Sequence, residues 1–279
     1  MKYRHSYHAG NFADIHKHVT LLALLAALRR KEKGFAYLET HAGRGLYDVS
    51  SPTEASTAGV GKFTATQHDA PELQDFTRLI ADVRSKQRER SHAYPGSPLI
   101  AAHELRAQDR AVFCELVPTE ARALDKVLQG AAQFRVEEGD GFERLRAWLP
   151  PPERRGLILI DPPYEETRDF ERVVAAVADA LRRFETGVIA VWFPIKDERD
   201  TAAWTASFAR AVQRETLSSE LWLYPRDSRV ALNGSGLLIV NPPYLLADRM
   251  AAWLPELQAS LAVANTGGTH IRTLRPPSQ

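Results

Sequence analysis

Residues 154–165 read RRGLILIDPPYE, and this stretch decides the fold class of the chain. The run GLILID (156–161) is apolar up to its last residue, which is typical of a strand buried on both faces of a sheet. Asp161 stands where the strand ends, and Pro162 and Pro163 fix the direction of the backbone that follows. The stretch therefore predicts a buried parallel strand that carries a carboxylate to the edge of a sheet.

Hydrophobic patterns on both sides of this strand alternate between strand and helix. Further strands are predicted at 35–40, 111–116, 133–138 and 187–193. Helices are predicted from about Asp14, with one apolar side, and at about 71–90, 118–129, 168–184 and 199–214. A further helix is predicted at 97–107, with Ser97 as its N-cap and Pro98 in its first position. This alternation indicates a doubly wound α/β sheet whose first five strands run parallel.

The C-terminal part of the chain breaks the alternation. Strands predicted at 220–224 and 236–241 are joined by PRDSRVALNGS, in which Asn233-Gly234 has the chemistry of a hairpin turn. The two strands are therefore expected to pair antiparallel. Five parallel strands followed by such a hairpin resemble the Rossmann-like fold of class I S-adenosylmethionine-dependent methyltransferases, a seven-stranded sheet of order 3-2-1-4-5-7-6.

Composition and charge exclude several classes of protein. The chain has 279 residues, 44% of them hydrophobic, with a net charge of +1 and one cysteine, Cys114, so an internal disulfide and a four-cysteine zinc site are excluded. The apolar stretch Val19–Leu28 is shorter than the ~20 residues needed to cross a bilayer, and RRKEK follows it without a cleavage site. We therefore expect a cytoplasmic protein with no membrane partner.

Basic residues are locally enriched in two segments. Residues 1–45 hold eight Lys or Arg against three acids, and RSKQRER (84–90) forms a second basic run. Such clusters can contact the phosphates of nucleic acids. A solvated helix face is the alternative explanation of each cluster, and the sequence leaves both open.

Polar and glycine residues follow the first three predicted strands. These residues are His41-Ala42-Gly43-Arg44-Gly45, then Glu115, then Gly139-Asp140-Gly141-Phe142. In open α/β sheets, ligands bind outside the carboxyl ends of the strands, where an acid can accept the ribose hydroxyls of an adenosine cofactor and Asp140 could contact its adenine. Plain turns remain the alternative, whereas a P-loop and a dinucleotide-type GxGxxG are absent.

Asp161-Pro162-Pro163-Tyr164 is similar to the DPPY motif of amino-methyltransferases. An exocyclic adenine amine is a poor nucleophile, because its lone pair is delocalised into the ring. Asp161 and the carbonyl of Pro162 can accept hydrogen bonds from its two N–H groups, and Tyr164 can stack on a flipped-out base. Asn241-Pro242-Pro243-Tyr244 is a variant of the same motif, but an antiparallel last strand would place it at the opposite edge of the sheet, so a structural role is predicted.

The N-terminal segment 3–18 is dense in polar and aromatic side chains. Metal binding by His5, His8, His16 and His18 is considered, but no carboxylate spacing supports it. We therefore expect no metal, and we interpret the segment as one that contacts the cofactor and the base.

Taken together, the motifs resemble the RlmJ family of 23S ribosomal RNA adenine-N6 methyltransferases. The matching stretches are YRHSYHAGNFADIHKH, THAGRG, YPGSPLIA, EGDGF and RRGLILIDPPYE. The resemblance implies a methyltransferase domain at 1–45 and 96–279 with a helical subdomain inserted at 46–95. It also implies S-adenosylmethionine as cofactor, and methylation of adenine 2030 of 23S rRNA on naked RNA during ribosome biogenesis, by a monomer with no obligate protein partner.

The resemblance also assigns roles to individual residues. It implies cofactor contacts for His18, His41, Ser97, Glu115, Asp140, Gly141 and Asp161, with Lys17 and Gly43 beside them. Asp161 should be the catalytic carboxylate, helped by Pro162 and Tyr164, and Tyr3 should meet the substrate adenine. The chain departs from the pattern at Glu39, where an Asp is expected, and at Arg44 between the two glycines, which leaves the shape of that loop open.

Three alternatives remain from the sequence. A DNA adenine methyltransferase would share the DPPY motif but usually has a larger target-recognition region. A non-catalytic RNA-binding assembly factor would not need the intact Asp161 and Tyr164. A nicotinamide oxidoreductase is disfavoured by the incomplete glycine fingerprint.

Overall fold

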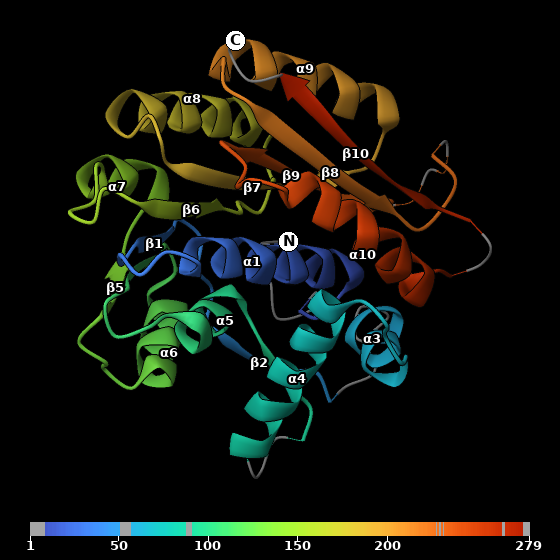
Figure 1. Cartoon of the computed structure of the whole chain (residues 1–279), viewed down its shortest axis with the longest axis horizontal. Coiled ribbons are helices and arrows are strands. Elements are labelled where there is room, and N and C mark those ends of the chain that lie inside the picture. Colours follow the sequence, from blue (N-terminus) through green and yellow to red (C-terminus); the bar gives the residue numbers. More distant parts are fainter. Residues whose placement is uncertain are drawn as a thin grey trace.

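The computed structural model describes residues 9–50, 57–87, 91–226, 228, 230, 232–263 and 266–275. A main sheet runs through the molecule (Figure 1) in the order β10-β8-β9-β7-β6-β1-β4-β5. Its strands are β1 (Ala36–Glu39), β4 (Arg110–Glu115), β5 (Phe134–Glu138), β6 (Gly156–Ile160), β7 (Val188–Ile195), β8 (Thr216–Trp222), β9 (Gly234–Val240) and β10 (Gly268–Arg275). No helix in the described part of the chain is long and apolar enough to span a membrane.

The pairing of the strands confirms the predicted class I methyltransferase topology. Strands β5, β4, β1, β6 and β7 pair parallel in that order, and β9 pairs antiparallel with both β7 and β8. The seven predicted strands therefore have the order that was expected from the sequence. The structure adds β10 as an eighth strand, antiparallel to β8 at the sheet edge.

The turn of the terminal hairpin was predicted in the wrong place. Gly234 is the first residue of β9, opposite Trp222, and buried Asn233 closes a longer loop with its side chain. The Asn233 side chain donates to the carbonyl of Pro225 (2.8 Å) and accepts from the backbone N–H of Tyr224 (3.2 Å). An Asn-Gly pair therefore marks the point where a long loop re-enters a strand, rather than a two-residue turn.

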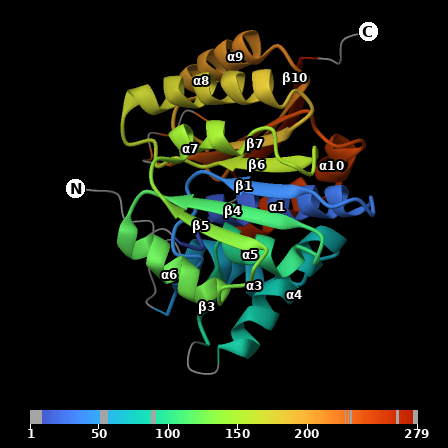
Figure 2. The ribbon, with the colours of Figure 1, turned by 90° about the vertical axis from the view of Figure 1, so that its left-hand side faces the viewer.

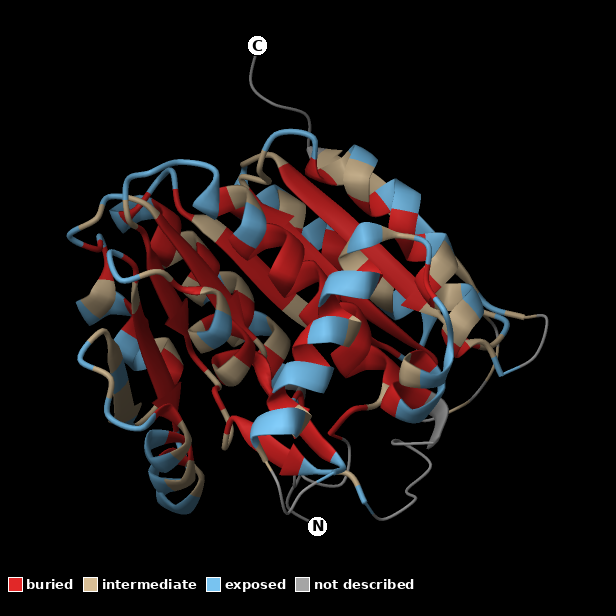
Figure 3. Cartoon of the chain, turned by 60° about the horizontal axis from the view of Figure 1, so that its bottom comes forward, coloured by how far each residue is buried: buried red, intermediate tan, exposed pale blue. Residues whose placement is uncertain are grey.

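Helices cover both faces of the sheet (Figure 2). The helices α1 (Phe12–Arg29), α5 (Ser97–Glu104), α6 (Pro118–Leu128) and α10 (Leu246–Leu261) share one hydrophobic core, and α7 (Gly141–Trp148), α8 (Thr167–Arg183) and α9 (Glu198–Val212) share the other. Alternate residues of one strand serve the two cores, since Tyr37 lies in the first and Leu38 in the second. Figure 3 shows that the inner strands of the sheet are mostly buried, as expected for a sheet covered on both faces. The two edge strands, β5 and residues 268–274 of β10, consist of partly buried and exposed residues.

Helix α1 is buried along most of its length, whereas the sequence predicted one apolar side. All residues from Phe12 to Leu25 are buried, because α4 (Pro71–Lys86), α5, α10 and β9 surround the helix. The polar residues of α1 therefore need internal partners. The ring of His16 hydrogen-bonds Ser219 (2.9 Å) and Ser235 (3.0 Å), and burial lowers its pKa to about 3, so this histidine is neutral.

The segment predicted as an insertion contains its own short elements. These are β2 (Leu46–Asp48), the π-helix η2 (Thr57–Gly61), α3 (Lys62–Ala65), α4 and β3 (Ala93–Pro95). Strands β2 and β3 pair antiparallel, so the segment leaves and rejoins the main domain at one place. Its buried Phe63 and Phe76 belong to the same hydrophobic core as α1, and a separate subdomain stays a prediction.

Candidate active site

The loops that follow β1, β4, β5 and β6 meet at the carboxyl edge of the sheet. Backbone hydrogen bonds join them directly, from Thr40 N–H to the Leu159 carbonyl (3.1 Å) and from Ala42 N–H to the Cys114 carbonyl (2.9 Å). Gly139 N–H donates in the same way to the Glu115 carbonyl (3.1 Å). Most of the residues to which the sequence assigned a role in ligand binding are thus brought to one edge of one rigid sheet.

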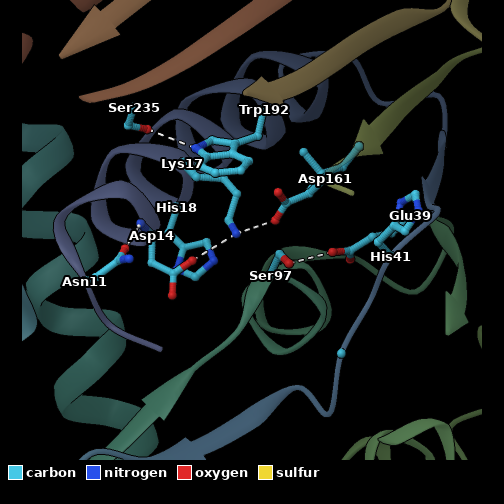
Figure 4. A network of polar contacts seen from close by, with 12 residues as sticks. Asn11, Asp14, Lys17, His18, Glu39, His41, Ser97, Asp161, Trp192 and Ser235 are labelled. Atoms are coloured by element: carbon cyan, nitrogen blue, oxygen red, sulfur yellow. Dashed lines mark hydrogen bonds and ion pairs between the residues drawn. The ribbon is translucent and has the colours of Figure 1, made fainter. Parts of the chain in front are cut away.

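The carboxylate of Asp161 is held by a buried ion cluster that the sequence did not reveal (Figure 4). The ammonium group of Lys17 lies 2.5 Å from Asp161 Oδ2 and 2.9 Å from Asp14 Oδ1. The side chains of Lys17 and Asp14 are each 5% exposed, and that of Asp161 is 13% exposed. Burial alone would lower the pKa of Lys17, but the two carboxylates raise it above its ordinary value, so Lys17 stays charged.

The first turn of α1 fixes the position of Lys17. The side chain of Asn11 caps the helix by accepting the N–H of Asp14 (2.9 Å), and Asp14 Oδ2 accepts the N–H of Gly10 (2.9 Å). Asp14 is therefore locked at the helix start, and it orients the ammonium group three residues further on. The second oxygen of Asp161, Oδ1, accepts no hydrogen bond from any residue that the structure describes, so it is free to accept one from a substrate.

The glycine loop after β1 is fastened by Glu115. Its carboxylate, at the end of β4, accepts the N–H of Gly43 (2.7 Å) and that of Val117 (2.8 Å). Gly43 has φ of +63°, a left-handed conformation that favours glycine. Arg44 turns away from the loop and binds Glu120 with two hydrogen bonds of 2.7 Å, so this departure from the family pattern anchors the loop to α6.

Asp140 and Gly141 form the first turn of α7, a helix that the sequence did not predict. Asp140 caps it by accepting the N–H of Phe142 (2.9 Å), and a Cβ on Gly141 would lie 2.0 Å from the Thr40 carbonyl oxygen. Arg172 of α8 donates to Asp140 Oδ2 (2.5 Å) and lies over the ring of Phe142 at 4.5 Å. Burial would raise the pKa of Asp140, but the hydrogen bond and charge of Arg172 hold it below its ordinary value.

We expect Arg172→Met to weaken the binding of S-adenosylmethionine about tenfold, the effect of one charged hydrogen bond, while the rate at saturating cofactor changes little. The reason is that Asp140 loses the cation that holds its carboxylate in place. Calorimetric titration with the cofactor measures the affinity. Arg168→Met is the matched control, since this residue is on the same helix with its side chain 72% exposed. Equal affinities of the two variants would remove Arg172 from the site.

His18 and Ser97 are more deeply buried than a direct cofactor contact requires. His18 is 1% exposed and its Nδ1 lies 2.6 Å from the hydroxyl of Tyr94. Ser97 was expected to cap α5 with its side chain, but the cap residue is Gly96, and the Ser97 hydroxyl donates instead to Glu39 Oε1 (2.5 Å). The predicted cap is therefore wrong, and the cofactor contacts of His18 and Ser97 stay predictions.

Glu39 is a fully buried acid at the end of β1. It accepts hydrogen bonds from Ser97 and from the hydroxyl of Tyr37 (3.0 Å). Burial raises the pKa of Glu39 from 4.5 to about 8, against the opposing effects of these two hydrogen bonds and of the charge of Lys17. The carboxyl group therefore changes its protonation state in the physiological range of pH.

This acid should make the stability of the protein depend on pH. The folded state holds the proton of Glu39 more tightly than the unfolded state, so its contribution is complete below pH 4.5 and is lost as pH rises through about 8. We expect the melting temperature to fall over this range, and to fall less in Glu39→Gln. Thermal unfolding from about pH 5 to 9 measures this. Glu120→Gln, at a partly exposed ion pair, is the control, and parallel curves for all three proteins would contradict the prediction.

Tyr164 lies inside the second hydrophobic core rather than on the surface of the site. Its side chain is packed at 4.5 Å from the ring of Phe170, its hydroxyl donates to the carbonyl of Trp192 (2.6 Å), and 7% of the residue is exposed. Its φ of +49° is a left-handed conformation, which reverses the chain after the two prolines. In this position Tyr164 fixes the loop that carries Asp161, and its packing does not favour the predicted stacking on a base.

His41 follows β1 and contacts the first turn of α7. Its ring meets Phe142 edge-on at 4.9 Å, and its Nδ1 lies 2.8 Å from the hydroxyl of Thr40. Burial lowers the pKa of His41 to about 4, so its ring is neutral at physiological pH. A neutral histidine can approach a positively charged cofactor without repulsion.

Some of the sequence-based assignments lie outside the described residues. They are those of Tyr3, His5 and His8, together with Arg88 and Arg90 of the second basic run. Within the described residues there is no cluster of histidine, cysteine or carboxylate side chains that could hold a metal ion. His16, one of the histidines considered for metal binding, uses both ring nitrogens for the serine hydroxyls of β8 and β9.

The second proline motif has the structural role that was predicted. Asn241 follows β9, which runs antiparallel to β7, so it lies at the opposite edge of the sheet from Asp161. Its side chain donates to the carbonyls of Glu185 and Gly187, both at 2.9 Å, and so holds the loop before β7. Tyr244 of the same motif is 84% exposed.

Comparison with known proteins agrees with this fold. Residues 32–274 match the family model described as "Ribosomal RNA large subunit methyltransferase D, RlmJ". The chain is similar to Ribosomal RNA large subunit methyltransferase J of Haemophilus influenzae and of Escherichia coli, with 37% identity over 281 residues that cover 99% of each chain. It is also similar to a protein of Legionella pneumophila with a crystal structure, at 37% identity and a TM-score of 0.85, over 95% of this chain and 98% of that one.

Proposed function

The chain belongs to the RlmJ family, and on this basis we propose that it transfers a methyl group from S-adenosylmethionine to N6 of an adenine in 23S ribosomal RNA. The observation that carries the proposal is the position of Asp161. It ends a buried parallel strand at the carboxyl edge of the sheet, is fixed there by Lys17, and keeps Oδ1 available. The choice of adenine 2030 and the preference for naked RNA rest on the family resemblance.

The residues at the carboxyl edge fit S-adenosylmethionine. Glu115 uses one lone pair of each oxygen for backbone N–H groups, so both oxygens can still accept a ribose hydroxyl. Next to it, Leu116 and Val117 expose 64% and 47% of their surface, which offers an apolar contact for an adenine ring. Gly43, His41, Asp140 and Gly141 also belong to the predicted binding set and lie in the loops at this edge, and the absence of a Cβ at Gly141 lets α7 begin directly against β1.

The bound cofactor supplies a methyl group on a positively charged sulfur, and the protein has to prepare the amine. Oδ1 of Asp161 and the carbonyl of Pro162 accept no hydrogen bond from the described residues, so each can accept one N–H of the adenine amine. These two bonds would favour a pyramidal nitrogen with a free lone pair. Transfer of the methyl group to that nitrogen would break the bond between methyl carbon and sulfur, leave S-adenosylhomocysteine, and release one proton of the amine to solvent. Lys17 keeps Asp161 in one orientation throughout, which is the electrostatic preorganisation that enzymes commonly use.

Transfer of labelled methyl groups tests the proposed function. The substrates are deproteinised 23S rRNA that lacks the modification, intact large subunits, and duplex DNA. Label in N6-methyladenosine from the naked rRNA is the expected result. Label in DNA alone would support a DNA methyltransferase instead. RNA binding without cofactor binding would support a non-catalytic assembly factor.

A further inference from the structure

A hydroxyl-lined pocket lies in the inserted segment, on α3, α4 and the turn before β3. Its volume is about 510 Å³. The polar side chains that line it are Thr64, Thr77, Arg84, Ser85 and Ser91. No carboxylate is among the lining residues. The pocket therefore combines one cation with several neutral hydrogen-bonding groups.

Arg84 has no charged partner among the described residues. Its Nε donates to the carbonyl of Ala93 (3.1 Å), and no ion pair joins its guanidinium to any residue that the structure describes. Arg84 is half-buried, and this burial lowers its pKa. Burying a guanidinium without a counter-charge costs free energy, which an anion in the pocket would offset. The remaining N–H groups of the Arg84 guanidinium are arranged so that they can donate hydrogen bonds to two oxygens of a phosphate.

The hydroxyl groups around Arg84 can turn toward such an anion. Thr64 and Thr77 now donate to the carbonyls of Val60 (2.8 Å) and Leu73 (2.9 Å), one helical turn before them. A hydroxyl hydrogen rotates freely, and these carbonyls lie within helices where a backbone N–H can bind them as well. The hydroxyl groups of Thr64 and Thr77 can therefore donate hydrogen bonds to an anion in the pocket.

The pocket is linked to the catalytic edge of the sheet by a short strand pair. Arg84 binds Ala93, the first residue of β3, and Pro95 at the end of β3 pairs with Leu46, next to the glycine loop. Gly96 N–H then donates to the carbonyl of Gly45 (2.8 Å) within that loop. Two residues of strand, or about 7 Å, separate the Arg84 contact from this end of β3. The wall of the pocket is thus joined through β3 to the glycine loop of the candidate site.

We propose that this pocket binds a backbone phosphate of the RNA substrate. The proposal rests on the proposed function for the identity of the RNA. The other role open to Arg84, a favourable interaction with the C-terminal dipole of α4, is shared by Lys86 and would leave RNA binding unchanged.

The test measures the dissociation constant of the unmodified 23S rRNA, without turnover, over a series of salt concentrations. Arg84→Met should weaken binding about tenfold and reduce the salt slope by about one phosphate contact, and Arg84→Lys should restore the slope in part. Arg78→Met is the matched control, because Arg78 is on the same helix, 72% exposed and paired with Asp75. Unchanged affinity and slope in Arg84→Met, with normal methyl transfer by the wild type, would overturn the phosphate site but not the proposed function.

A second measurement uses inorganic phosphate as the probe, with chloride at equal ionic strength as the reference. Phosphate should raise the melting temperature of the wild type and of Arg78→Met, but not that of Arg84→Met. If phosphate acts in this way while RNA binding is unaffected by Arg84→Met, the pocket holds free phosphate only and the RNA proposal fails. If the wild type binds the RNA through Arg84 but transfers no methyl group, the pocket stands and the proposed function fails.

Discussion

Asp161→Asn should reduce methyl transfer to 23S rRNA about 10³-fold, while the affinity for S-adenosylmethionine changes little. Asparagine has the shape of aspartate, so the loop and the contact with Lys17 can persist. The amide carries no negative charge, however, and it can present its NH₂ group to the amine where the carboxylate presents an acceptor. Because the proposed mechanism needs an acceptor at Oδ1, the loss should appear in the rate at saturating substrates.

Single-turnover transfer of labelled methyl groups, with cofactor binding measured in parallel, checks this expectation. Tyr244→Ala is a suitable control, because it lies in the second proline motif, is 84% exposed, and is at the opposite edge of the sheet. We expect it to transfer at the wild-type rate. Wild-type turnover by Asp161→Asn would remove the carboxylate from the mechanism. An equal loss of methyl-transfer rate in Asp161→Asn and Tyr244→Ala would show that the effect is not specific to the Asp161 motif.

The sheet could be predicted from the sequence because most of its strands have recognisable apolar sequence patterns. Continuous apolar runs such as GLILI in β6 mark strands that are buried on both faces, and the alternation of strands with helices limits the topology. Strand β10 was missed, since GTHIRTLR lies at the sheet edge, where one neighbour suffices and polar residues are tolerated. Helix α7 was missed because Gly139 and Gly141 are typical of a turn, whereas here they permit a helix to start tight against β1.

The motif residues of the site could be predicted, but not the residues that hold them. Lys17 and Asp161 are 144 residues apart, and nothing local in either segment indicates the 2.5 Å contact between them. Arg172 likewise stands in a helix of ordinary amphipathic pattern, and its contact with Asp140 depends on how α8 packs beside α7. Tyr164 was expected at the surface because of its motif, and the packing of Phe170 and Trp192 decides otherwise. Such partners depend on tertiary structure.

Lys17→Met is expected to have the second large effect, on stability and on activity together. The substitution removes the cation that the buried carboxylates of Asp14 and Asp161 share. Removing one partner of a buried ion cluster typically costs about 3–5 kcal/mol of folding free energy. Chemical denaturation measures this loss, and the methyl-transfer assay below the unfolding transition measures activity.

A double variant separates the two effects of Lys17. In Lys17→Met with Asp14→Asn, one of the two uncompensated charges is gone, so part of the lost stability should return. Activity should not return, because Asp161 still lacks the ammonium group that fixes Oδ2 and leaves Oδ1 to the substrate. Recovery of both stability and transfer would show that Lys17 serves the fold alone. Recovery of stability without transfer would support the proposal that Lys17 orients the carboxylate of Asp161, in agreement with its burial and its 2.5 Å contact with that residue.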